Sequence, residues 1–126
     1  MVVEGLLYTK DHEWVRMEGD VATIGITDYA QQMLGELVFV ELPAAGKELA
    51  AGDELAVVES TKAANDVYAP TPGKVVDVNN ELESRPELIN EDCYSTGWIC
   101  KLQVADTKSV EDLMDSTQYE EYVGSL

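Results

Sequence analysis

Basic residues are scarce in this chain of 126 residues. Eight lysines and arginines stand against 25 aspartates and glutamates, so the formal net charge at pH 7 is −17. A surface with this excess of negative charge repels phosphate backbones and anionic lipid headgroups. We therefore expect no nucleic-acid partner and no membrane partner, and we expect the charge to favour docking on basic surfaces of other proteins.

Metal ligands and long apolar runs are also rare. His12 is the only histidine, and Cys93 and Cys100 do not form a Cys-x-x-Cys pair, so the sequence predicts no metal site. Two buried reduced thiols are a more frequent arrangement than a disulfide in a cytoplasmic chain. No apolar run approaches the roughly 20 residues of a membrane span. The first 14 residues carry acids early and lack the basic region of a targeting peptide. We expect a cytoplasmic protein, or a mitochondrial matrix protein if this is a trimmed eukaryotic form.

Short segments rich in valine and isoleucine recur along the chain, separated by Gly, Pro, Asp or Asn. This pattern predicts antiparallel strands rather than alternating strands and helices. The expected strands cover residues 21–26, 36–42, 54–60, 66–69, 74–78 and 98–104. The length suits a single domain over residues 1–126. The sequence therefore predicts a mainly β fold with two antiparallel sheets in a sandwich.

Helical signals are few and lie between or after the strands. Thr27 or Asp28 can cap a short helix that ends at Gly35. Asp106 or Thr107 can cap a C-terminal helical segment at about residues 107–123. The polar stretch 81–92 reads as a loop with at most one helical turn. We expect these few short helices to pack on the outside of the sandwich.

A lysine stands at the centre of the most informative segment. Residues 57–70 place strand-forming residues on both sides of Ser60-Thr61-Lys62-Ala63-Ala64, which predicts a β-hairpin. Hairpin tips usually carry Gly, Asn or Asp, yet Lys62 is at the tip here. A lysine between small residues on a stiff hairpin suits an enzyme that acylates its amine. The ordinary alternative is a solvated surface lysine.

A catalytic lysine is a further alternative. A nucleophilic lysine must lose its proton near neutral pH, which burial or neighbouring cations promote. Lys62 instead lies between Glu59 and Asp66, whose carboxylates favour the charged amine. The chain also has no acid/base histidine pair and no Gly-rich phosphate loop. These features disfavour an enzyme.

The hairpin resembles a known lipoylation site. The strings Glu59-Ser60-Thr61-Lys62-Ala63 and Asp66-Val67-Tyr68-Ala69-Pro70 are similar to the hairpin of glycine cleavage H proteins. Further similarity lies in His12-Glu13-Trp14, in residues 25–46, in residues 75–90 and in Gly97-Trp98-Ile99. Biotin carriers differ because methionines typically flank their lysine. Two departures are Asp11 before His-Glu-Trp and Cys93-Tyr94-Ser95-Thr96 before Gly-Trp, where the family usually has Pro-Tyr-Gly.

This resemblance implies a fold, a cofactor and a set of partners. It implies a lipoyl/biotinyl-carrier sandwich (a barrel-sandwich hybrid) with lipoate attached as N6-lipoyllysine at Lys62 and with Glu59 in the hairpin motif. It also implies that Glu13 and Asp66 lie near the loaded aminomethyl group. The expected partners are a pyridoxal-phosphate glycine decarboxylase, a tetrahydrofolate-dependent aminomethyltransferase, dihydrolipoamide dehydrogenase and lipoate attachment enzymes. Such a carrier catalyses no step itself, and we expect a monomer.

Two alternatives to this role stay open on the sequence alone. One is a lipoylated carrier that serves another complex or relays lipoyl groups to other proteins. The other is an unmodified interaction domain that keeps the fold without the cofactor. The intact mass of the protein would distinguish the second from a lipoylated carrier.

Overall fold

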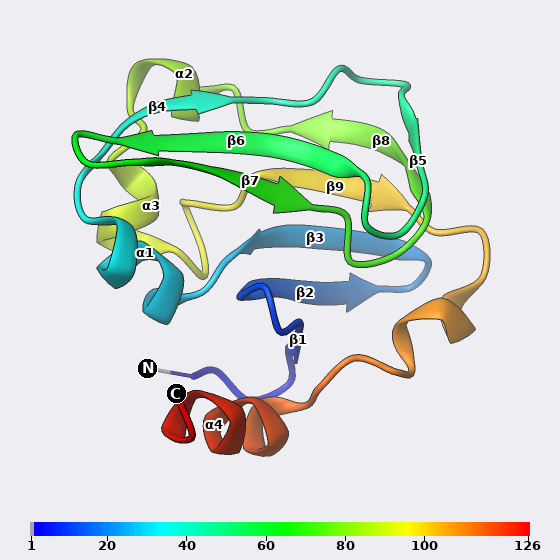
Figure 1. The fold of residues 1–126 in the computed structure, drawn as a ribbon. Coiled ribbons are helices and arrows are strands. Elements are labelled where there is room, and N and C mark those ends of the chain that lie inside the picture. Colours follow the sequence, from blue (N-terminus) through cyan, green and yellow to red (C-terminus); the bar gives the residue numbers. More distant parts are fainter. Residues whose placement is uncertain (1) are drawn as a thin grey trace.

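The computed structural model describes residues 2–126 as two antiparallel sheets with short helices around them (Figure 1). One sheet has six strands in the order β1-β2-β3-β9-β8-β5, and the other has three in the order β4-β6-β7. The strands are β1 (Leu7–Tyr8), β2 (Glu13–Glu18), β3 (Val21–Ile26), β4 (Leu37–Glu41), β5 (Glu48–Leu49), β6 (Glu54–Ser60), β7 (Ala64–Tyr68), β8 (Gly73–Val78) and β9 (Cys100–Gln103). This confirms the predicted fold class.

All six expected strands are present, with some ends shifted by a few residues, whereas β1, β2 and β5 were not predicted. β1 and β5 are two-residue strands, too short to give a periodic pattern. In β2 the first three residues are all buried, and the first of them is the acid Glu13. Alternation of polar and apolar residues therefore does not mark this strand.

The helices lie at the ends and edges of the sheets. They are α1 (Asp28–Leu34), α2 (Glu81–Ser84), α3 (Leu88–Asp92), the 3-10 helix η1 (Thr107–Val110) and α4 (Ser116–Gly124). Thr27 caps α1 by accepting a hydrogen bond from the Ala30 amide, and Gly35 ends it with φ +81°. The stretch 81–92, expected to hold at most one helical turn, forms two short helices. No helix in residues 2–126 is long and apolar enough to cross a membrane.

The C-terminal helix packs against the N-terminal strand. Met114 lies between η1 and α4. Its backbone exchanges two hydrogen bonds, of 2.8 and 2.9 Å, with the backbone of Tyr8 in β1. The rings of Tyr8 and Tyr119 stack with centroids 4.5 Å apart. Figure 1 shows α4 beside β1, on the side of the molecule away from the three-stranded sheet. The N-terminal strand and the C-terminal helix are therefore packed together at the β1 edge of the six-stranded sheet.

The core lies between the two sheets and continues beneath α3. Trp14 is fully buried, and its indole N–H donates to the carbonyl of Cys93 over 2.9 Å. Gly25 lies against the indole, because a Cβ there would be 2.6 Å from two ring carbons. Cys93 and Cys100 are buried free thiols, in agreement with the sequence prediction. Burial raises the pKa of each thiol to about 12, so both stay protonated at neutral pH.

Candidate functional site

Lys62 lies in a tight turn that its own neighbours hold. β6 and β7 pair antiparallel with Glu59 opposite Ala64, and the Ser60 amide donates to the Ala63 carbonyl over 2.8 Å. The Ser60 hydroxyl accepts hydrogen bonds of 3.2 Å from the amides of Lys62 and Ala63. A serine hydroxyl can do this because it has two acceptor lone pairs. The turn is thus fixed by local hydrogen bonds of Ser60, although it carries no Gly, Asn or Asp at its tip.

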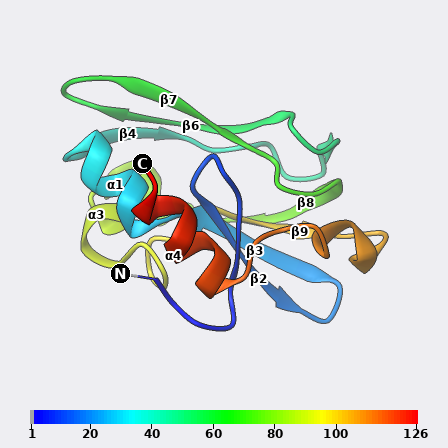
Figure 2. The ribbon, with the colours of Figure 1, turned by 60° about the horizontal axis from the view of Figure 1, so that its bottom comes forward.

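The side chain of Lys62 is exposed and lies against the end of α1. A Cβ built on Gly35 would come within 3.2 Å of Lys62 Cε. In Figures 1 and 2 the β6–β7 turn lies beside the chain that leads from α1 into β4. The backbone of Gly35, with φ +81° and ψ −159°, is in a region that only glycine occupies readily. Glycine therefore serves both the helix end and the close approach of the lysine.

A hollow separates the hairpin from the segment before β2. It has a volume of about 440 Å³ and is lined by Lys10, Asp11, His12, Ala64, Asn65, Asp66 and Tyr68. We call this hollow the hairpin cleft. We call residues 10–14, of which the first three line the cleft, its N-terminal wall. Asp11 and Asp66 are both exposed in it. The cleft thus presents two carboxylates from opposite sides, one of which is the predicted Asp66.

Glu13 lies behind the cleft rather than in its lining. Its side chain is 2% exposed, and its two carboxyl oxygens accept from the Thr9 hydroxyl (2.6 Å) and from the Tyr68 amide (3.3 Å). Burial raises the pKa of Glu13 to about 7, against the opposing effect of these two hydrogen bonds. Glu13 therefore joins β2 to β7 and titrates near neutral pH.

His12 is held by the C-terminal helix. A hydrogen bond of 2.8 Å joins its Nδ1 to the Tyr119 hydroxyl, which lies 2.8 Å from the Thr27 hydroxyl as well. The His12 backbone has φ +67°, a left-handed conformation that few non-glycine residues adopt. Burial lowers the pKa of His12, and Asp11 opposes this shift. The histidine is therefore a structural member of the wall.

The structure brings some of the predicted site residues together and separates others. Lys62 and Glu59 are on the hairpin near the end of α1, Asp66 is in the cleft, and Glu13 is behind it. Sequence reasoning missed Thr9, Tyr68 and Tyr119 as partners of the wall. Tyr119 is 107 residues from His12, and no local pattern reports a contact across that distance.

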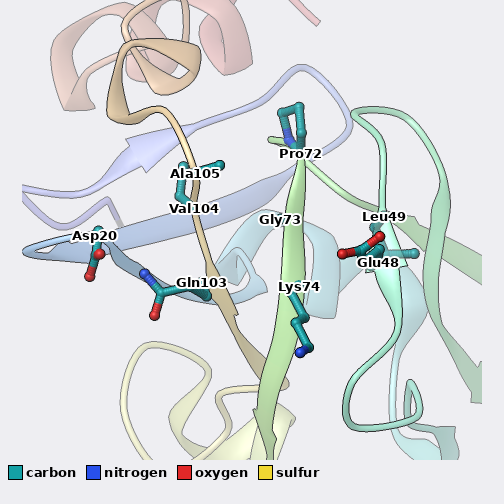
Figure 3. A pocket seen from close by; sticks show the side chains of 9 residues that line it. All are labelled: Asp20, Glu48, Leu49, Pro72, Gly73, Lys74, Gln103, Val104 and Ala105. Carbon is teal, nitrogen blue, oxygen red and sulfur yellow. The ribbon is translucent and has the colours of Figure 1, made fainter.

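Another hollow lies away from the lysine. It has a volume of about 450 Å³, and its lining includes Glu48 of β5, Lys74 of β8 and Gln103 of β9 (Figure 3). In Figure 1, β5 lies at the end of the sheets opposite the β6–β7 turn. It contains none of the predicted site residues. No group of three or more His, Cys, Asp or Glu residues within residues 2–126 could hold a metal ion.

Comparison with known proteins agrees with this geometry. The family model for the glycine cleavage H-protein matches residues 6–125. The glycine cleavage system H protein of Parvibaculum lavamentivorans is 56% identical over 119 residues, covering 94% of this chain and 95% of that protein. The H protein of Halothermothrix orenii is 50% identical over 122 residues, covering 97% of this chain and 95% of that protein.

A solved structure is also similar. The glycine cleavage system H protein from Mycobacterium marinum superposes with a TM-score of 0.86 at 36% identity, and the match covers 98% of each chain. Members of this family carry a lipoyl-lysine cofactor and act with the enzymes of the glycine cleavage system. The chain belongs to the glycine cleavage H-protein family and is a lipoyl carrier that catalyses no step itself.

Proposed function

We propose that Lys62 is the residue that carries the lipoyl group and that the hairpin cleft receives the loaded end of the arm. The observation that carries this proposal is the exposed lysine in a turn tied by Ser60, on the one hairpin that borders the cleft. An attachment enzyme needs an accessible amine on a well-defined backbone. Lys62 is exposed, and hydrogen bonds to Ser60 hold its turn.

The lipoyl group supplies, when bound, a dithiolane that can accept an aminomethyl group and two electrons. The chain's own residues supply the surroundings. Asp66 and Asp11 present carboxylates in the cleft, where a cationic amine is attracted to them. The same hollow shields its contents partly from water, which slows side reactions of a labile group.

Glu13 supports the cleft indirectly in this proposal. Both of its carboxyl oxygens are engaged by Thr9 and by the backbone of Tyr68, and it does not line the hollow. It holds β7 against the N-terminal wall and so sets the spacing between Asp66 and Asp11. The resemblance implies that Glu13 and Asp66 both lie near the amine, whereas the geometry favours Asp66 for direct contact and Glu13 for positioning.

The partners of the system act on the carrier by transient docking. A net charge of −17 opposes self-association at low salt, which supports a monomer. We expect the carrier to act in the cytoplasm, because the relatives named above are bacterial proteins. Lipoate attachment enzymes are further partners, since the amine must be acylated before the carrier can work.

The test is enzymatic lipoylation followed by mass spectrometry. Incubation with lipoate, ATP and a lipoate attachment enzyme should add one lipoyl mass, located on Lys62 by peptide mapping. Lys62→Arg should remain unmodified and keep its fold, whereas the control variants Lys47→Arg and Lys74→Arg should be modified fully. Label on Lys47 or Lys74, or a biotin adduct on Lys62 from a biotin attachment enzyme, would contradict the assignment.

A further inference from the structure

Three large apolar side chains are exposed near Lys62. Met33 is 67% exposed, Val38 52% and Phe39 48%, and they make up half of the six large hydrophobic residues that are exposed in residues 2–126. Met33 is two residues before Gly35, which lies against the lysine side chain. Val38 and Phe39 are on β4, whose partner strand β6 leads into the lysine turn. We call these three residues the apolar patch.

A β-bulge produces part of this exposure. Leu37 pairs with Ser60 and Phe39 with Glu59, so Val38 is an extra residue on β4. In a regular strand one of two successive side chains would point into the core, but the bulge leaves both Val38 and Phe39 exposed. β4 is also the edge strand of its sheet. Exposed apolar residues on an edge strand favour association with other chains, so the apolar patch is a candidate protein interface.

Acidic residues surround the apolar patch. Glu36 and Glu41 are exposed on either side of Val38 and Phe39, and Glu59 is half-buried opposite Phe39. A hollow of about 480 Å³ extends from Phe39 to Val78 and Glu83. The complementary surface on a partner is therefore an apolar projection or pocket with basic side chains around it.

We propose that the apolar patch is the docking surface for the enzyme that acylates Lys62; this inference rests on the proposed role of Lys62. The enzymes that use the loaded arm act on its far end and not on the backbone of the turn. The attachment enzyme must instead bring the Lys62 amine itself into its active site, so it has to cover the surface within one lysine side chain of the turn. The apolar patch is the exposed hydrophobic surface in that position.

ATP drives the acylation of Lys62. Lipoate is activated as its adenylate with release of pyrophosphate, and the deprotonated Lys62 amine attacks the activated carboxyl. The amide bond forms as the bond to AMP breaks, and the proton of the amine passes to solvent. The apolar patch takes no part in this chemistry and acts on binding alone.

The test compares lipoylation kinetics of variants at matched exposed positions. The double variant Val38→Ser and Phe39→Ser should lower kcat/KM for lipoylation by about tenfold, mainly through KM, because it removes two apolar side chains from the centre of the interface; a tenfold loss corresponds to about 1.4 kcal/mol. The control is Val76→Ser on β8 of the other sheet, where the side chain is 47% exposed, and its kcat/KM should be unchanged. The variant Phe39→Leu, which keeps an apolar side chain, should recover most of the activity.

The outcomes separate this inference from the proposed function. Unchanged kcat/KM in the double variant, with Lys62 still modified, overturns the docking surface and leaves the lysine assignment intact. Failure of the wild-type chain to accept lipoate at Lys62 overturns the assignment itself. The double variant can be lipoylated fully with excess attachment enzyme, and the decarboxylase should then aminomethylate it at the wild-type rate. If the rate of aminomethylation falls as much as the kcat/KM for lipoylation, the attachment enzyme is not the specific partner of the apolar patch.

Salt dependence tests the charge of the partner surface. The Debye length falls from about 30 Å at 0.01 M salt to about 8 Å at 0.15 M. If basic side chains of the enzyme face Glu36, Glu41 and Glu59, the KM of the wild-type chain should rise over this range. A constant KM would overturn the proposed basic rim.

Discussion

The hairpin that carries the lysine turn borders the same cleft as the N-terminal wall, but the turn and the wall are built in different ways. The turn is closed by hydrogen bonds of Ser60 to residues two and three positions away. The wall depends on partners far along the chain, with His12 bonded to Tyr119 and Trp14 bonded to Cys93. The part that presents the amine is therefore local and exposed, whereas the part that we propose to receive the arm depends on contacts across the whole fold.

The largest expected difference between the two regions is in stability. Trp14→Ala should lower the free energy of unfolding by about 3 to 5 kcal/mol, because it removes a fully buried indole and leaves a cavity. Lys62→Ala, at an exposed turn, should change it by less than about 0.5 kcal/mol. Chemical denaturation of the two variants measures both values. Equal losses would show that the turn is as deeply coupled to the fold as the wall.

The second expected effect is a pH dependence that arises in the wall alone. The pKa of Glu13 rises from its ordinary 4.5 to about 7 on folding, so the folded state holds this proton more tightly than the unfolded state. The stability that it contributes is fully present below pH 4.5 and is lost as the pH rises through about 7. The loss amounts to about 3 kcal/mol at most.

Glu13→Gln isolates this contribution. The amide oxygen of glutamine can still accept from the Tyr68 amide, and the side chain carries no titrating group. Denaturation between pH 4.5 and 8 should therefore give a flatter stability profile in this variant. Glu18→Gln, an exposed position on the same strand, is the matched control and should keep the wild-type slope. If the unfolding free energy of Glu13→Gln depends on pH as steeply as that of the wild type, a group other than Glu13 causes the dependence.

The smallest expected effect concerns the link between the wall and α4. Tyr119→Phe removes the hydroxyl that bonds His12 and the fully buried Thr27, at a cost of about 1 to 2 kcal/mol in unfolding free energy. Tyr122→Phe is the control, because its hydroxyl makes a single exposed bond of 3.4 Å to the Lys10 carbonyl. Thermal unfolding should rank the two variants in this order. The opposite order would contradict the proposed support of His12 by α4.

The difference between local and long-range contacts also explains which features the sequence could predict. Strands β3 and β6 begin and end at the expected residues, because Val- and Ile-rich segments between turn residues are locally distinctive. The hairpin with its lysine was recognisable for the same reason. β2 was missed, because its first three residues are all buried and the first of them is the acid Glu13, so polar and apolar residues do not alternate. The exposure of Val38 beside Phe39 depends on a bulge, which follows from the pairing of β4 with β6 and not from either strand alone.

The joint between the chain ends has a consequence for the order of folding during synthesis. Residues 54–68 can pair as a hairpin soon after they leave the ribosome, because the contacts between β6 and β7 are close in sequence. His12 cannot meet Tyr119 until the last residues of the chain have emerged. We expect the lysine to be presented on nascent chains whose cleft is still incomplete, so that a chain cut short before α4 displays the acceptor amine without a finished place to shelter the arm.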